Sequence, residues 1–274
     1  MSIKTSELIT AINEFAPSDL QEYWDNTGWQ INFCYEKVDK VLVALEIVEG
    51  TIQEAKNLGA DFILTHHPLF FTEFKKVEIS SLNGRYLIDL VRAGISVFSA
   101  HTSFDSAEGG MNDRLATLCG LKDIKHITPS ETSKPGTTQE SAALASMPRC
   151  GVLSKKTKFI EYIAFVEEAL DMKGRLKIVG SPNTIIQKVA VCGGAGGNFI
   201  SDLIAMDFDL FITSDVKHNQ AQLAKEKGLC VIDGGHFGTE QHFTEVAAAN
   251  LRKVFGDKIE VFETNVSADP FQVL

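Results

Sequence analysis

Short apolar runs separated by helical patterns constrain the fold of this chain more than any other feature. The runs Lys40–Glu46, Asp61–Thr65 and Ile95–Ala100 are almost continuously apolar, which is typical of strands that are covered on both faces. Helical spacing fills the segments between them, and the helix before the third run is expected to end at Gly94. Strand, helix and strand with short joins predict right-handed βαβ units and a mostly parallel sheet.

The same pattern continues on both sides of this region. An amphipathic helix is expected over residues 5–15, and another begins near Gly110. After residue 150 we expect a helix over 159–170, strands over 175–179 and 188–192, and a helix that ends near residue 206. Asp209–Thr213 then echoes Asp61–Thr65, and Lys227–His236 echoes Ala93–His101. An internal duplication and the general likeness of βα units explain this echo equally well.

A segment of different composition divides the chain. Residues 129–149 are rich in Ser, Thr and Pro, which is typical of an irregular connection. We place a domain boundary there, so that residues 1–128 and 236–274 form a discontinuous first α/β domain and residues 129–235 form the second. Each domain is expected to contain a mostly parallel sheet covered by helices, and 274 residues are enough for two such cores.

Charge and cysteine content exclude several classes of protein. The chain has 26 Lys and Arg against 36 Asp and Glu, a net charge of −10, and no basic cluster, so nucleic-acid binding is not expected. Its five cysteines lie far apart without a Cys-x-x-Cys spacing, which argues against a disulfide framework or a thiolate zinc site and favours a reducing cytoplasm. The sequence has no apolar signal core and no run of about 18 apolar residues, so we expect a soluble cytoplasmic protein without membrane contact.

Two neighbouring histidines follow one of the apolar runs. His66 and His67 come directly after Thr65, and Pro68 stops the strand ladder, so the chain turns where the imidazoles emerge. Binding sites of open α/β sheets form outside the carboxyl ends of the strands. Because neighbouring residues of a strand face opposite sides, this pair is expected to serve two ions, or one ion and a supporting role.

Further metal donors follow two other apolar runs. His101 and Asp105 come after the third run, while His236 and Glu240 come after the last. The latter two are four residues apart and share one face of a helix expected to begin near Phe237. Imidazole and carboxylate donors together suit zinc, iron or manganese. The sequence therefore predicts a site for two divalent metal ions.

Two more segments at strand ends have two explanations each. The glycine-rich segment Cys192–Asn198 could form an anion-binding nest of backbone amides, or let a helix pack tightly on a strand. It matches neither Gly-x-Gly-x-x-Gly nor a Walker motif, and tight packing is slightly favoured. Asp215, Lys217 and His218 could contact a substrate, or Asp215 could cap the following helix. Isolated histidines are more often hydrogen-bonded or solvated than metal-bound, and we interpret three in that way: His126, His218 and His242.

The order of these motifs resembles one known family. The motifs are, in order, Trp24–Gly28, Thr65–Phe70, His101–Asp105, Val191–Gly196, Asp215–His218 and Gly235–Glu240. Over nearly the whole chain they resemble the signatures of the Nif-three-like proteins, the GTP cyclohydrolase I type 2 homologues. The span from His126 to Gly151 is too short for the central domain inserted in the long members of that family, so the chain resembles the short form.

The resemblance implies a metal centre and an assembly. It implies a two-domain α/β fold, a dinuclear metal centre in the inter-domain cleft, and a toroidal homo-hexamer whose metals face an internal cavity. The metal ligands of the family fall, by motif, on His66, His67, Asp105, His236 and Glu240. The residues expected around these ligands are His101, Asp25, Glu46, Asp215, Lys217 and His218. Glu46 and Trp29 stand where the family commonly has Asp and Leu, which alters the expected wall of the pocket.

An open dinuclear site predicts hydrolytic chemistry. Five donors supply about seven bonds if both carboxylates bridge, whereas two ions need roughly eight to twelve, so water completes the coordination. Such water, with its pKa lowered from 15.7 toward about 7, would be the reactive group, with no catalytic side chain beyond it. We expect a metal-dependent hydrolase acting on an unidentified small molecule, such as a nucleotide or a nitrogen heterocycle. The alternative is a non-catalytic protein that stores or delivers metal, or regulates a docked partner.

Overall fold

Two compact units make up the computed structural model, which describes residues 2–72, 75–127 and 147–272. The first unit consists of Met1–Ala107 and Phe243–Phe271, and the second of Glu108–His242 and Gln272–Leu274. The boundary predicted near residue 129 falls within 128–146, which lies outside the described residues. In this division residues 108–127 and 236–242 belong to the second unit, whereas the sequence assigned them to the first domain.

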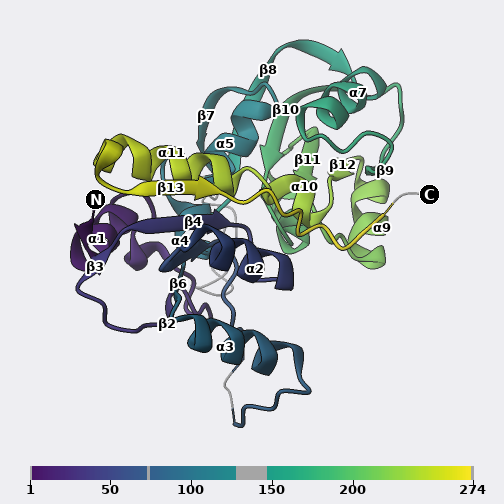
Figure 1. The fold of residues 1–274 in the computed structure, drawn as a ribbon. Helices are drawn as coiled ribbons and strands as arrows, with labels where there is room; N and C mark the ends of the chain where they lie inside the picture. The colour runs from purple at the N-terminus through teal and green to yellow at the C-terminus, as the bar shows by residue number, and fades with distance from the viewer. Residues whose placement is uncertain (1, 73–74, 128–146, 273–274) are drawn as a thin grey trace. The chain divides into compact units, whose positions relative to one another are not determined.

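The first unit is built on a five-stranded sheet (Figure 1). Its strands, together with a separate antiparallel pair, are β1 (Ile3–Lys4), β2 (Gly28–Ile31), β3 (Lys37–Val38), β4 (Lys40–Ala44), β5 (Phe62–Thr65), β6 (Ser96–Ser99) and β13 (Glu260–Glu263). The sheet has the order β13-β4-β5-β6-β2, and β1 pairs with β3 outside it. The pairings from β13 to β6 are parallel, whereas β2 is antiparallel to β6.

Helices cover this sheet. They are α1 (Thr5–Phe15), α2 (Glu49–Leu58), α3 (Leu82–Ala93), α4 (Thr102–Ser106) and α11 (Phe243–Phe255), with 3₁₀ turns at Ser18–Leu20 and Gly256–Lys258. α2 and α3 pack through Ile52 and Leu90 against Leu42, Ile63 and Val97 of the three central strands. The side chains that alternate with these along the strands are also buried, as expected for strands covered on both faces.

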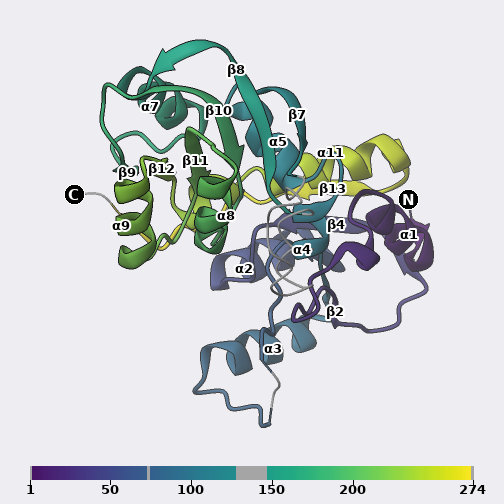
Figure 2. The ribbon, with the colours of Figure 1, turned by 180° about the vertical axis from the view of Figure 1, so that it is seen from behind.

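The second unit contains a six-stranded sheet (Figure 2). Its strands are β7 (Lys122–His126), β8 (Arg149–Lys158), β9 (Lys177–Val179), β10 (Ile185–Val191), β11 (Leu210–Thr213) and β12 (Cys230–Asp233). The order is β7-β8-β10-β11-β12-β9. The central strands β10, β11 and β12 are parallel, and the remaining pairings of the sheet are antiparallel.

Both sheets are therefore mixed, and the prediction of mostly parallel sheets is wrong. The cause lies in the strands that pair antiparallel: β2, β7, β8 and β9. β7 and β9 consist of exposed and partly exposed residues, β2 is buried at one residue of four, and the second half of β8 is exposed or partly exposed. Strands of this kind lack the continuous apolar run that identifies a central parallel strand. The sequence consequently revealed the central strands but not the direction of their neighbours.

Helices also cover both faces of the second sheet. They are α5 (Met111–Leu118), α7 (Phe159–Ala169), α8 (Ile200–Ala205), α9 (His218–Lys227) and α10 (His236–Glu240), with a 3₁₀ turn at Gly197–Phe199. Leu210 and Ile212 of β11 face the core beneath α5 and α7, while Phe211 between them faces α8 and α9. This alternation follows the two-residue period of a strand. None of the helices in the described ranges is long and apolar enough to cross a membrane.

The echo between the two halves extends to their hydrogen bonds. Asp61 accepts from the backbone N–H of Lys40 at 3.0 Å, and Asp209 accepts from the N–H of Lys188 at 2.7 Å. The ammonium group of each lysine donates to a carbonyl at the C-terminal end of the next helix, α2 or α8. The strand pairs β4–β5 and β10–β11 also have equivalent registers. These shared contacts favour an internal duplication over a general likeness of βα units.

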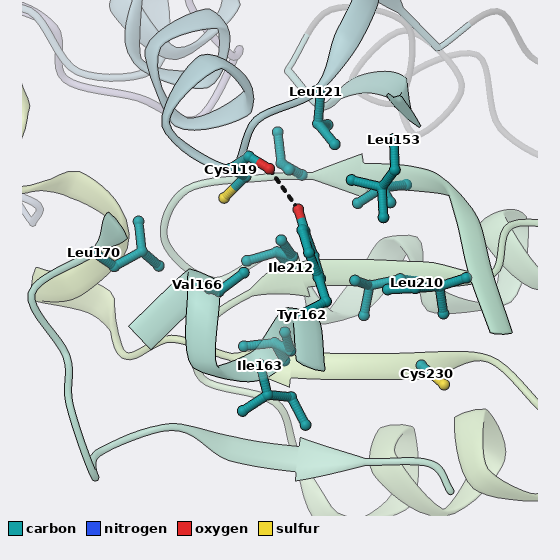
Figure 3. Packing of buried hydrophobic residues seen from close by; sticks show 14 of the residues in the cluster. Cys119, Leu121, Leu153, Tyr162, Ile163, Val166, Leu170, Leu210, Ile212 and Cys230 are labelled. Atoms are coloured by element: carbon teal, nitrogen blue, oxygen red, sulfur yellow. Dashed lines mark hydrogen bonds between the residues drawn. The ribbon is translucent and has the colours of Figure 1, made fainter. Parts of the chain in front are cut away.

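One polar contact lies within the core of the second unit (Figure 3). The hydroxyl of Tyr162 on α7 donates to the backbone carbonyl of Cys119, at the end of α5, over 2.7 Å. Burial raises the pKa of the Tyr162 hydroxyl far above its ordinary value and raises the pKa of the Cys119 thiol to about 12. Both groups therefore stay neutral, and the hydrogen bond satisfies a buried donor while joining two helices.

Tyr162→Phe removes this hydroxyl and keeps the ring. We expect the free energy of unfolding of the second unit to fall by about 1 kcal/mol, because a buried hydrogen bond contributes about 0.5–1.5 kcal/mol net. Urea unfolding followed by circular dichroism measures the change. Tyr23→Phe is the matched control, because Tyr23 is 74% exposed. Equal shifts for the two variants would contradict the prediction.

Candidate metal centre

Three histidines of the first unit form a cluster. His66, His67 and His101 each offer a ring nitrogen, and these ligand atoms all lie within 4.8 Å of one another. The ring centroids are 5.0 Å apart for His66 and His67, 5.1 Å for His66 and His101, and 5.6 Å for His67 and His101. His66 is fully buried, His101 is buried and His67 is partly exposed. Three imidazoles at this spacing fit a divalent cation such as zinc, iron or manganese.

The turn after β5 places both neighbouring histidines in this cluster. The backbone N–H groups of His66 and His67 both donate to the carbonyl of Leu45, at 3.1 and 2.9 Å. The hydroxyl of Thr65 donates to the carbonyl of His67 at 2.9 Å, which holds the turn closed. The chain has therefore left the regular strand at His66. The prediction that the two side chains face opposite sides is wrong, because it assumed that the strand geometry continues.

Hydrogen bonds fix the orientation of two of the imidazoles. The Nδ1 of His66 lies 3.0 Å from the carbonyl of Ala100, and the Nδ1 of His101 lies 2.7 Å from the Asp25 carboxylate. A carbonyl or a carboxylate accepts, so Nδ1 carries the proton, and Nε2 has a lone pair whenever the ring is neutral. Near the third ring, Glu46 Oε1 lies 3.9 Å from His67 Nδ1. This arrangement leaves Nε2 as the ligand atom of His66 and His101.

Asp25 is the hub of the hydrogen bonds beside His101. Besides the imidazole, its carboxylate accepts from the backbone N–H and hydroxyl of Thr102 and from the hydroxyl of Thr27. Burial raises the pKa of Asp25, but the hydrogen bond and charge of His101 and the bonds from Thr102 outweigh burial and lower it to about 2. The sequence singled out Asp25 but missed its partner Thr102. The available signal was a threonine close to each of two candidate residues: Thr27 two places after Asp25, and Thr102 directly after His101.

Asp105 adds a carboxylate to the same unit. It lies in α4, is 3% exposed, and has its Oδ1 3.7 Å from His66 Nε2. α4 begins directly after His101, whose carbonyl accepts from the backbone N–H groups of Phe104 and Asp105. The short helix thus turns the Asp105 side chain back toward the end of β5. The first unit therefore provides imidazole and carboxylate donors together.

The second unit provides another histidine and carboxylate. In α10, His236 Nε2 lies 3.2 Å from Glu240 Oε2, and His236 Nδ1 lies 2.7 Å from Asp215 Oδ2. The four-residue spacing predicted for one helical face is present. Burial lowers the pKa of His236, whereas the hydrogen bonds and charges of Glu240 and Asp215 raise it, and the balance is about 10. A metal ion binding at Nε2 therefore has to displace a proton.

The glycine-rich segment supports Glu240. Its amides bond within the unit: Gly193 N–H donates to Asn112, Gly194 N–H to Thr239 and Gly196 N–H to Thr213. These three amides are occupied within the unit, which favours tight packing over the anion-nest interpretation. Gly194 has φ +63°, and a Cβ there would overlap with Glu240 Oε1. The glycine therefore leaves the space in which the carboxylate lies.

Family membership follows from comparison with known proteins. The model of the DUF34/NIF3 family (NGG1p interacting factor 3) matches residues 3–270. The chain belongs to this family. A Clostridium perfringens protein named GTP cyclohydrolase 1 type 2 homolog is 31% identical over 274 residues, which cover 99% of this chain and 100% of that protein. NIF3-like protein 1 of Drosophila melanogaster is 26% identical, with 97% of this chain and 88% of that protein covered.

Solved structures share the fold of this NIF3-family chain. The Bacillus cereus protein related to NIF3 has a TM-score of 0.88 at 21% identity, with 99% of both chains covered. Reduced HcgD from Methanocaldococcus jannaschii has a TM-score of 0.79 at 26% identity, with 97% of this chain and 99% of that chain covered. The resemblance predicted from the motifs is thereby confirmed, and so is the α/β class of the fold.

Two predicted pocket residues lie on the surface of the second unit. Lys217 and His218 are exposed at the start of α9, where the backbone N–H of Lys217 donates to the Gln220 side chain. Asp215 precedes this helix but bonds to His236, so the capping explanation for Asp215 is replaced by an orienting contact. In this NIF3-family chain the motif Asp215–His218 therefore contributes to the candidate metal centre through Asp215, which orients His236.

Gly194→Ala tests the fit of the Glu240 carboxylate. The added methyl group is expected to displace this side chain and weaken divalent-cation binding about 10-fold or more, the usual effect of disturbing the support of a ligand. Gly174→Ala is the matched control, because Gly174 also has a positive φ, +72°, but no atom within 4 Å of an added Cβ. Competition with a chromogenic chelator measures the affinity. Equal affinity in the two variants would contradict the prediction.

Asp25→Asn tests the ionised carboxylate through pH. Because its pKa is lowered in the fold to about 2 from 3.8, its contribution to stability is present in full above about pH 4 and is lost as the pH falls toward 2. We expect the variant to unfold at lower urea concentration than the parent at pH 7, and the gap to shrink between pH 4 and pH 2. Asp257→Asn, at an exposed position, is the control. A gap that stays constant with pH would contradict the prediction.

Proposed function

We propose that this NIF3-family protein binds two divalent metal ions and acts as a metal-dependent hydrolase. The proposed ligands are His66, His67 and Asp105 of the first unit with His236 and Glu240 of the second, and His101 lies beside them. The observation that carries the proposal is the cluster of three histidine ligand atoms within 4.8 Å. The carboxylate and carbonyl acceptors that orient these rings are typical of metal-bound histidines.

Burial of the carboxylates supports a cationic occupant. Asp105 and Glu240 are each only 3% exposed. Buried charges are stable in proteins when they are paired or coordinate a metal. Each carboxylate also lies beside an imidazole nitrogen, at 3.7 Å for Asp105 and 3.2 Å for Glu240. A divalent ion bound at each of these nitrogens would neutralise the carboxylate beside it without requiring the imidazole to be protonated.

Hydrolysis follows from a donor set that leaves coordination positions to water. Divalent ions in such a site supply a water of lowered pKa and polarise the electrophile. The residues of this chain orient the imidazoles: Asp25 and Asp215 accept from the Nδ1–H groups of His101 and His236, which keeps each Nε2 directed away from them. We propose a nucleotide or a nitrogen heterocycle as substrate, in line with the cyclohydrolase wording in the names of relatives.

The assembly we propose is a toroidal homo-hexamer in the cytoplasm. The support comes from the motifs shared with the family rather than from an interface of this chain. Multi-angle light scattering on the purified protein measures the mass directly. A monomeric or dimeric mass would contradict the proposed hexamer but would not affect the assignment of the metal ligands.

Removing one ligand from each unit tests the metal assignment. His67→Ala and Glu240→Ala are expected to lower the metal content of the purified protein from two equivalents to one or none, as measured by plasma mass spectrometry. His218→Ala and Glu226→Ala, at exposed positions of α9, are the matched controls and should keep two equivalents. Anomalous scattering from crystals soaked in manganese or zinc locates the ions. Two full equivalents in both ligand variants would refute the assignment.

The catalytic part of the proposal is tested separately. Asp105→Ala is expected to abolish turnover in a panel of nucleotides and phosphoesters, because it removes a proposed bridging ligand. Turnover that survives this change would point to a different active site. Two bound metal equivalents that exchange rapidly, without turnover of any compound, would instead identify a protein that stores or delivers metal.

A further inference from the structure

Two exposed aromatic side chains flank the histidine cluster of the first unit. Trp24 is 54% exposed and Phe71 is 59% exposed. The ring centroids of both lie close to that of His101, at 6.0 Å for Trp24 and 5.6 Å for Phe71, and Phe71 also lies 6.4 Å from the ring of His67. Trp24 and Phe71 therefore border the proposed metal ligands while presenting apolar surface to water.

Hydrogen bonds hold together the two loops that carry these rings. The side-chain amide of Asn26 donates to the carbonyl of Phe70 at 2.7 Å, and the N–H of Phe70 donates to the side chain of Gln30 at 3.2 Å. Gln30 in turn donates to the carbonyl of Asn26 at 2.7 Å. Trp24 and Phe71 each lie within two residues of this network. Their spacing is consequently set by the fold, as a binding surface requires.

The ring geometry leaves stacking surface available. Trp24 meets the His101 ring at an interplanar angle of 77° and Phe71 meets it at 83°. Neither Trp24 nor Phe71 is stacked face to face on the imidazole. His101 therefore does not cover the face of either aromatic ring as a stacked partner would. Large exposed aromatic groups of this kind mark sites of interaction, and stacking on them binds aromatic rings of many sorts.

We propose that Trp24 and Phe71 bind a planar aromatic ring of the substrate. The inference rests on the proposed function, which it deepens by naming the chemical feature that the site recognises. Stacking on these side chains holds the ring at the edge of the histidine cluster, so that a bond near the ring lies next to His67 and His101. Trp24 and Phe71 are thus specificity-determining residues, and compounds without an aromatic ring are poor ligands.

Fluorescence of Trp24 provides a direct readout. The chain has two tryptophans, and Trp29 packs edge-on against Phe62 and Phe98, so Trp29→Phe leaves Trp24 as the reporter with conservative repacking. The probes are guanosine and adenosine, which carry a ring but no phosphate, and ribose, which has no aromatic ring. We expect saturable quenching by at least one nucleoside and none by ribose. No saturable quenching by either nucleoside would overturn the proposal.

A second substitution separates stacking from general effects. In the Trp29→Phe background, Phe71→Leu is expected to weaken nucleoside binding about 10-fold, a typical consequence of removing one stacking partner. Phe165→Leu is the matched control, because Phe165 is 46% exposed in the second unit, and it should leave the affinity unchanged. Unchanged affinity in Phe71→Leu would overturn the proposal. A different outcome is that the parent protein shows no quenching by nucleosides while the Phe71→Leu variant has a smaller molecular mass than the parent in light scattering. That result would overturn the proposal and show that Phe71 contacts another copy of the chain.

Each titration is carried out with and without EDTA to keep the two proposals distinguishable. Quenching that persists in EDTA supports aromatic binding whether or not the protein loads metal. Two metal equivalents without quenching would remove the aromatic site alone and leave the metal assignment standing. Quenching in a protein that never loads metal would refute the proposed function while supporting the ring-binding role of Trp24 and Phe71.

Discussion

A single backbone oxygen determines the arrangement of the first half of the candidate centre. The carbonyl of Leu45, just after β4, accepts the N–H groups of both His66 and His67. β4 and β5 are parallel neighbours, so their carboxyl ends meet at one edge of the sheet, where this shared acceptor turns the chain. Because the turn is made of backbone bonds between buried strands, the positions of the two imidazoles follow from the sheet itself rather than from a flexible loop.

Support for the imidazoles comes from residues that are distant in sequence. Asp25 lies 76 residues before His101, and Asp215 lies 21 residues before His236. Such pairs arise only when loops from different strands meet, so hydrophobic periodicity carries no information about them. The glycine-rich segment supports Glu240 in the same way, through the space that Gly194 leaves. Precise donor placement in this chain is therefore a property of the tertiary structure.

Predictions from the sequence succeeded where a local pattern has a local cause. The buried central strands were recognised from continuous apolar runs, and the end of α3 was recognised at Gly94, which has the left-handed φ of +68° that glycine tolerates best. They failed where the cause is not local. β2 is antiparallel to β6 although its sequence does not reveal a direction, and the orientation of His67 depends on the Leu45 carbonyl 22 residues away. The candidate ligands were identified because donors recur after strand ends. Thr102 follows a strand end as well but was missed because its role depends on Asp25, 77 residues earlier. Asn112 was missed because it lies within a helix and its partner, Gly193, is 81 residues away.

Corresponding strand ends of the two units carry different side chains. The carbonyl of Thr65 accepts from Ala100 N–H and that of Thr213 accepts from Gly234 N–H, each at 2.8 Å, so the residues two places beyond these threonines occupy corresponding positions. One is His67, whose imidazole belongs to the histidine cluster. The other is Asp215, whose carboxylate bonds to His236. The corresponding position therefore supplies a candidate metal donor in the first unit and an acceptor that orients a histidine in the second.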